Sequence, residues 1–127
     1  MVTEQQYREI LQRWMEILNA RDWDAFDKLV DGALTPDYVG HLPGGPVRGA
    51  AGMKQAFRNI VGSIPGYRAT IEDVVAAGDK GAARMTTHRT DPATGKAQYL
   101  PVLLFSRMKG DKFAEDWELI GAWQDEA

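Results

Sequence analysis

The amino-acid sequence predicts an α+β fold, in which three N-terminal helices pack on one face of an antiparallel sheet. Two observations support this fold class. Apolar residues recur at helical spacing as far as Ile64 and then alternate with a period of two from Tyr67 onward. The 127 residues, 44% of them hydrophobic, contain no internal repeat, low-complexity stretch or linker. We therefore expect residues 1–127 to form a single domain with a substantial core.

Three helices are predicted in the first half of the chain. The first spans Thr3–Asn19, because its apolar side chains share one helical stripe and Thr3 and Gln6 have the spacing of a capping box. A short second helix begins near Asp22, where acidic residues suit the positive end of the helix dipole. The third spans Gly49–Ser63, and a proline two residues later ends it.

The rest of the chain is expected to consist of strands and turns. Leu34–Val47 holds three prolines and three glycines, so it is expected to be irregular apart from a short strand at Tyr38–Leu42. After Gly66, period-two patterning predicts four long strands joined by short turns. These strands span Tyr67–Ala76, Lys80–Thr90, Lys96–Met108 and Lys112–Trp123.

The last two strands are apolar on both faces, unlike a sheet with one solvated face. In the strand before the last, Tyr99 and Phe105 share one parity. Leu100, Val102 and Leu104 share the other. We expect the aromatic-rich parity to face the helices. The outer sheet face then needs its own cover, and a second copy of the chain is the simplest one, so we predict a homodimer through the outer sheet face.

Charge and composition exclude several classes of function. The net charge is −3 and no basic stripe exists, so nucleic acid is not an expected partner. The longest apolar run, Leu100–Phe105, is far shorter than the ~20 residues of a membrane span. The N-terminal MVTEQQYREI is too polar for a signal peptide, and the absence of cysteine excludes disulfides and thiolate chemistry. We expect a cytoplasmic protein that binds no membrane.

Several segments share their order and spacing with a known family. They are Pro36–Gly44 with Val47–Gly49, Ile64–Pro65 followed by Thr70–Asp79, Thr94–Lys96 and Lys112–Trp117. Together they resemble the SnoaL-like polyketide cyclases, in the ester cyclase branch of the nuclear transport factor 2-like superfamily. The resemblance implies a cone, in which a curved antiparallel sheet of four to five strands is wrapped by three helices around a pocket. It also implies a dimer through the sheet.

The resemblance further implies a cofactor-free enzyme that closes rings by intramolecular aldol chemistry, in which a carboxylate removes a proton alpha to a carbonyl. The family's closing strand usually carries an aspartate four residues after its tryptophan, and that acid serves as general base. Trp117 occupies the tryptophan position, and the fourth residue after it is Gly121. The usual base is therefore missing from that position.

His41 is the first candidate catalytic residue. By the resemblance it lies at the pocket mouth, in a loop rich in glycine and proline. An imidazole transfers protons near neutral pH without special tuning. The alternative is a structural histidine that hydrogen-bonds a loop carbonyl.

Glu115 is the second candidate catalytic residue. It shares strand parity with Trp117, which points it toward the apolar pocket unless a bulge intervenes, and burial there would raise its pKa. The alternative is a salt bridge to Arg107 or Arg84. Asp116 lies on the opposite face in this register and needs a bulge to reach the cavity, so it is expected to be a surface or interface charge.

Further side chains are expected to line the pocket. Arg84, Thr86 and His88 alternate along one strand and share a face, which we place inside the cone, with the outside as the alternative. Core aromatic residues are expected to contact the ligand as well. The predicted substrate-binding residues are Trp14, Phe57, Arg84, His88, Tyr99, Phe105 and Trp117. No metal is expected, because His41 and His88 lack the spacing of a ligand pair.

These residues predict a small cofactor-free enzyme that moves a proton on a hydrophobic, carbonyl-containing small molecule, as a cyclase, isomerase or dehydratase. His41 or Glu115 would be the base, and the strip from Arg84 to His88 or a tyrosine hydroxyl would polarise the oxygen. One alternative is a non-catalytic module that binds an apolar small molecule or a partner protein. Another is epoxide hydrolysis, which needs paired carboxylates around a water. A pocket group whose pKa departs far from its ordinary value favours an enzyme.

Overall fold

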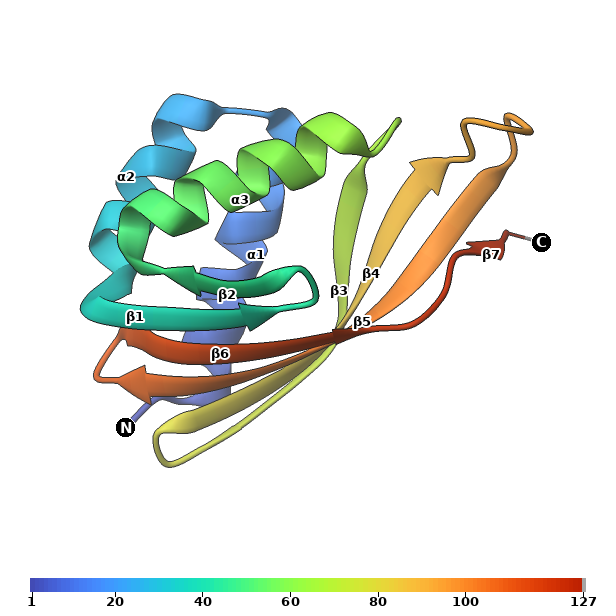
Figure 1. Cartoon of the computed structure of the whole chain (residues 1–127). Coiled ribbons are helices and arrows are strands. Elements are labelled where there is room, and N and C mark those ends of the chain that lie inside the picture. Colours follow the sequence, from blue (N-terminus) through green and yellow to red (C-terminus); the bar gives the residue numbers. More distant parts are fainter. Residues whose placement is uncertain (127) are drawn as a thin grey trace.

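The structure is a computed structural model that describes residues 1–126, and its α+β class with three helices confirms the predicted fold class. The helices are α1 (Glu4–Ala20), α2 (Trp23–Ala33) and α3 (Gly49–Ser63). The strands are β1 (Leu34–Leu42), β2 (Gly45–Arg48), β3 (Arg68–Ala77), β4 (Lys80–Thr90), β5 (Ala97–Lys109), β6 (Lys112–Ile120) and β7 (Gln124–Asp125). The helices cover one face of a strongly bent sheet (Figure 1).

Local sequence signals set the helix boundaries. At the start of α1, the Thr3 hydroxyl accepts from the Gln6 amide and the Gln6 side chain accepts from the Thr3 amide, so the predicted capping box is confirmed. Asp22 caps α2 by accepting from the amide of Ala25 at 3.1 Å. None of the helices in the described part of the chain has the length and apolar content needed to cross a membrane.

The sheet has the strand order β2-β1-β6-β5-β4-β3. Neighbouring strands run antiparallel except β1 and β6, which are parallel, and β7 pairs with β5 beyond the end of β6. Residues 34–47 were expected to be irregular apart from one short strand. They instead form the nine-residue strand β1 and most of the short edge strand β2. Pro36 falls between Leu34 and Val39, where β1 shifts register against β6, so the proline is tolerated in this strand.

The inner face of the sheet carries the aliphatic parity of β5. Leu100, Val102 and Leu104 are buried, whereas Leu103 and Phe105 are exposed. The prediction that the aromatic-rich parity meets the helices is therefore wrong. The physical reason is the cost of burying charge. Arg107 shares the aromatic-rich parity of β5, and Glu115 of β6 pairs with it. Both side chains would lose their hydration if this face met the helices.

A β-bulge in β6 decides which acids face inward. Between β5 and β6 the pairing shifts from Arg107↔Glu115 to Met108↔Phe113, so Ala114 is the extra residue. Phe113 is buried against Tyr7 and Trp14 of α1. Beyond the bulge, side chains of β6 again alternate between the two faces of the sheet, but each position faces the side opposite to the one it would face without the extra residue. Glu115 then faces outward, and Asp116 and Glu118 face the helices.

Candidate active site

The helices and the inner sheet face enclose a cavity made of two adjoining chambers. The outer chamber has a volume of about 450 Å³ and lies between α3, the β1–β2 turn and the ends of β5 and β6. The inner chamber has a volume of about 50 Å³ and lies deeper, between α1, β1 and β6. Leu42, Phe57 and Glu118 line both chambers. The outer chamber is within the range of small-molecule sites, and its walls are mainly apolar.

Asp116 is the most deeply buried carboxylate of the site, with 8% of the residue exposed. It lies in the middle of β6, beside Ser106 of β5 and Gly40 of β1. The Tyr38 hydroxyl donates to Asp116 Oδ2 at 2.6 Å. The second carboxylate oxygen, Oδ1, is buried without a hydrogen-bond partner among residues 1–126. Asp116 therefore presents one satisfied and one unsatisfied acceptor at the inner chamber.

Two glycines allow tyrosine side chains to reach this centre. A Cβ at Gly40 would lie 2.7 Å from the Tyr38 hydroxyl, so only glycine lets the Tyr38 ring fold over β1 toward Asp116. A Cβ at Gly81 would lie 2.7 Å from the Tyr7 ring. The Tyr7 hydroxyl reaches within 2.8 Å of Ser106 Oγ. The two glycines thus position hydroxyls on both sides of the buried carboxylate.

Glu118 is the carboxylate that a ligand can reach. It follows Asp116 by two residues on the same strand, so both side chains project from the inner sheet face. No side-chain hydrogen bond or ion pair joins it to another residue in the described range. It borders the outer chamber, where Tyr67 and Thr87 are the neighbouring polar side chains.

Burial raises the pKa values of both carboxyl groups. Desolvation raises the pKa of Asp116 to about 6, although the Ser106 and Tyr38 hydroxyls partly oppose the shift. Desolvation, together with the nearby Asp116 charge, raises the pKa of Glu118 to about 7. Burial also raises the pKa of Tyr67, and the Glu118 charge adds to the effect, so this hydroxyl keeps its proton and remains a donor. The cavity therefore combines a carboxyl that exchanges a proton near neutral pH with a neutral hydroxyl donor.

The two predicted catalytic residues lie together, but on the outer face of the sheet. His41 Nε2 is 2.7 Å from Glu115 Oε2, and the His41 ring stacks on Trp117 at a centroid distance of 5.4 Å. Arg107 donates to Glu115 Oε1 at 3.3 Å. The His41 hydrogen bond holds the pKa of Glu115 below its usual range, which is opposite to the expected shift. The expectation that Glu115 points into the pocket is wrong, because the bulge at Ala114 reverses the parity beyond it. His41, expected in a loop at the pocket mouth, lies instead in strand β1 opposite Trp117. The catalytic role of both residues stays a prediction.

The predicted substrate-binding residues are divided between the two sides of the sheet. Only Trp14 and Phe57 line the cavity. The other five lie on the outer side: Arg84, His88, Tyr99, Phe105 and Trp117. The expectation that Arg84 and His88 face inward is wrong, since Ala83 and Met85 of the same strand are the buried neighbours. His88 Nδ1 instead lies 2.7 Å from a carboxylate oxygen of Glu126.

The polar residues that line the cavity are ones to which the sequence analysis gave no catalytic role. Asp116 was expected at the surface, and neither Glu118, Tyr38 nor Tyr67 was singled out. No signal in the sequence alone could have found the acids, because the pairing of Glu118 with Leu104 of the aliphatic parity of β5 depends on the bulge at Ala114. Gly121 has the opposite orientation: a Cβ there would lie 3.3 Å from the Pro101 side chain, on the outer side of the sheet. An aspartate at position 121 would therefore not reach this cavity.

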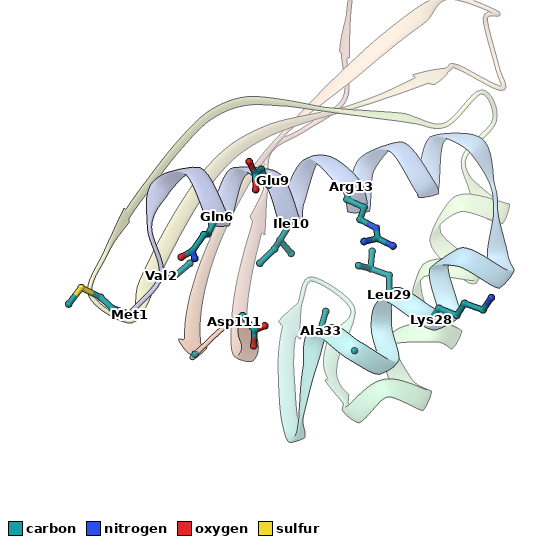
Figure 2. Close-up of a pocket in the computed structure, with 12 residues that line it drawn as sticks. Met1, Val2, Gln6, Glu9, Ile10, Arg13, Lys28, Leu29, Ala33 and Asp111 are labelled. Carbon is teal, nitrogen blue, oxygen red and sulfur yellow. The ribbon is translucent and has the colours of Figure 1, made fainter.

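A larger hollow of about 650 Å³ lies between α1, α2 and the β5–β6 turn (Figure 2). Its charged side chains are exposed and of both signs, namely Glu9, Arg13, Lys28 and Asp111. Exposed charges of this kind keep their hydration, and pairs of them contribute little to stability. Within residues 1–126, moreover, no three His, Asp or Glu side chains gather as a metal site requires.

Comparison with known proteins places the fold. The sequence profile of the SnoaL-like domain matches residues 11–116, and no functionally curated protein matches the chain. IdmH from Streptomyces antibioticus, described as a candidate polyketide cyclase, has a TM-score of 0.73 at 24% identity over 89% of this chain and 90% of IdmH. A candidate polyketide cyclase from Bacillus cereus ATCC 10987 has a TM-score of 0.70 at 27% identity, over 87% of this chain and 71% of that protein.

A third similar structure gives the fold its name. An NTF2-like (nuclear transport factor 2-like) protein of unknown function from Cytophaga hutchinsonii ATCC 33406 has a TM-score of 0.72 at 14% identity. The match covers 94% of this chain and all of the other. Three helices on a bent sheet are thus the NTF2-like arrangement that the resemblance implied. The sheet differs from the expected one in being mixed rather than antiparallel and in having seven strands rather than four to five.

Proposed function

Because the chain belongs to the SnoaL-like domain family, we propose that it is a cofactor-free enzyme that transfers a proton on a hydrophobic carbonyl compound. Glu118 is the proposed general base. It removes a proton from the carbon alpha to the carbonyl and later returns the proton to the product. The Tyr67 hydroxyl donates a hydrogen bond to the oxygen on which negative charge develops. Cyclisation, isomerisation and dehydration all begin with this step.

The observation that carries the proposal is the Glu118 carboxyl, which lines the apolar cavity with a pKa of about 7. A base with a pKa near the working pH combines a useful ionised fraction with a useful affinity for the proton. A module that only sheltered an apolar ligand would have no need of a carboxyl in its wall, where burial costs free energy. This consideration favours an enzyme over the binding-module alternative.

Proton transfer can be tested without knowing the natural substrate. Exchange of the alpha hydrogens of 1-indanone for deuterium, followed by NMR in D₂O near pH 7, reports the proposed step directly. We expect the wild-type protein to accelerate exchange above the buffer rate, and Glu118→Gln to reduce the acceleration by about 10²-fold or more. Tyr67→Phe is expected to reduce it by less, since a single donor is removed.

The matched comparison is Glu115→Gln, which removes the same charge from the outer face of the same strand. The proposal expects Glu115→Gln to exchange at a rate close to that of the wild type. Loss of exchange in Glu115→Gln but not in Glu118→Gln would instead support the pair His41 and Glu115. Binding of 1-indanone without faster exchange by the wild type would contradict the proposed reaction.

We also propose that the partner of the outer sheet face is a second copy of the chain. The exposed large hydrophobic side chains of this face support the proposal, namely Val75, Leu103, Phe105, Trp117 and Leu119. An apolar hollow of about 430 Å³ lies among them. Exposed apolar surface that spans several strands is typical of an interaction site.

A further inference from the structure

The cavity contains acidic groups without any basic partner. Asp116 and Glu118 are the only acidic residues among the described residues that line the two chambers, and no lysine, arginine or histidine lines either of them. The surface carboxylates behave differently, since Asp27 pairs with Arg58 and Glu115 with Arg107. A buried carboxylate ordinarily has a cation or hydrogen-bond donors to replace its hydration. In this cavity Asp116 has the Tyr38 hydroxyl as a donor and Glu118 has no side-chain partner among the described residues, so a bound donor would supply part of that replacement.

Asp116 Oδ1 supplies a second, independent observation. It is buried and makes no hydrogen bond of good geometry within residues 1–126, whereas Oδ2 of the same carboxylate accepts from Tyr38 and the nearby Ser106 hydroxyl also lowers the pKa of the carboxyl. Buried acceptors without partners are rare in folded proteins, and each one calls for an explanation. Asp116 lines the inner chamber. A donor placed in that chamber would satisfy it.

We propose that the cavity binds an apolar carbonyl compound carrying a protonated amine, whose N–H groups donate to Asp116 Oδ1 and whose positive charge lies beside the Glu118 carboxyl. This inference rests on the proposed function for the reaction, because it names the class of substrate for the same site. The ammonium group occupies the inner chamber, and the apolar body of the compound fills the outer chamber.

An ammonium group fits the inner chamber in both size and charge. A volume of about 50 Å³ holds one small polar group and is too small for a ring. An ammonium offers several N–H donors, and hydrogen bonds between ionised partners are about twice as strong as neutral ones. Trp14 and Phe57 lie in the chamber wall, and aromatic faces attract cations.

Other head groups fit less well. A hydroxyl could donate to Asp116 Oδ1, but it brings no positive charge to the two carboxyl groups. A carboxylate head would bring a third acidic group into a cavity that has no cation, where like charges repel strongly. The expected order of affinity is therefore amine, then alcohol, then carboxylate.

A ligand series with one shared apolar body isolates the head group. The probes are 2-aminoindane, 2-indanol and indane-2-carboxylate, titrated into the full-length protein by calorimetry near pH 7. We expect 2-aminoindane to bind about tenfold more tightly than 2-indanol, and indane-2-carboxylate to bind most weakly. Equal affinities for the three compounds, or preference for the carboxylate, would overturn the proposal.

Two isosteric variants locate the preference. Asp116→Asn and Glu118→Gln are each expected to reduce the advantage of 2-aminoindane over 2-indanol to less than threefold. Asp111→Asn, in the exposed β5–β6 turn, changes the net charge equally and should leave the advantage intact. If Asp116→Asn fails to fold, Glu118→Gln and the wild-type series still decide the question. An amine preference that survives in both cavity variants would place the amine elsewhere.

The outcome is separable from that of the proposed reaction. Amine preference is a binding measurement, whereas exchange of 1-indanone measures proton transfer. A protein that prefers the amine but does not exchange 1-indanone would retain this inference and lose the proposed reaction. A protein that exchanges 1-indanone and shows no amine preference would do the reverse.

Discussion

Asp116 and Glu118 illustrate how burial changes an ordinary acidic side chain. Their pKa values of about 6 and about 7 lie above those of exposed carboxyl groups because the apolar cavity walls penalise the charged form. Raised values mean that the folded protein binds these two protons more tightly than the unfolded chain does. Their contribution to stability is therefore complete below about pH 4 and is lost as the pH rises through 6 and 7.

Thermal stability is expected to fall between pH 5.5 and pH 8, because ionising the two buried carboxyls favours the unfolded chain. Tyr38 and Tyr67, which face the same cavity, keep their protons over this range since burial raises their pKa values as well. Glu118→Gln should reduce the fall and give a higher Tm than the wild type at pH 8. Glu16→Gln, on the exposed side of α1, is the control. A wild-type Tm that rises from pH 5.5 to pH 8 would contradict this prediction.

Strand β6 decides the chemistry of the site through one inserted residue. The bulge at Ala114 allows Phe113 to face inward and Asp116 to face inward as well, although regular alternation would place them on opposite faces. It also moves Glu115 to the outer face, beside His41 and Arg107. One backbone irregularity thus distributes the acidic residues of β6 between the cavity and the exposed side.

Deleting Ala114 should therefore be far more harmful than the loss of a small side chain. Without the bulge, either Phe113 leaves the core or Asp116 and Glu118 leave the cavity. Expulsion of a buried phenylalanine costs on the order of 3–5 kcal/mol, so the urea midpoint should drop accordingly. Deleting Ala93, in the exposed β4–β5 turn, is the matched control and should cost much less. A similar midpoint for the two deletions would refute the importance of the bulge.

At the scale of the whole molecule, the two faces of the sheet serve different purposes. The inner face forms the core and the cavity, whereas the outer face exposes several large apolar side chains, among them Leu119 at 71% and Leu103 at 55%. The cluster of His41, Glu115 and Arg107 lies on this outer face as well. An outer face that is both apolar and charged in this way suits a partner with the same surface, which supports the proposed homodimer.

The homodimer is expected to give twice the 14.1 kDa mass of one chain in light scattering at micromolar concentration. Leu119→Lys should shift the mass to that of a monomer, because the substitution adds a like charge to both sides of the proposed contact. Gln12→Lys, on the exposed side of α1, adds the same charge away from the sheet and should leave the dimer intact. A monomeric wild-type protein would rule out this interface.

The fold class and the helices could be predicted because their signals are local. The capping box at Thr3, the Asp22 cap and the end of α3 ahead of Pro65 each depend on residues within a few positions of one another. The hairpin of β3 and β4 was likewise predicted almost to the residue, since a turn between two alternating segments identifies it. The short β2 and the length of β1 were missed, because the pairing of β1 with β6 joins segments about 75 residues apart.

The identity of the site residues depended on tertiary structure. Sequence periodicity grouped Asp116 with Glu118 and Glu115 with Trp117, but it could not tell which group faced the helices. Side chains of a strand alternate with a period of two, so a single inserted residue exchanges the faces of everything beyond it. The insertion falls beside Phe113, which packs against Tyr7 and Trp14 of α1, and this tertiary contact is consistent with which carboxyl groups lie in the cavity.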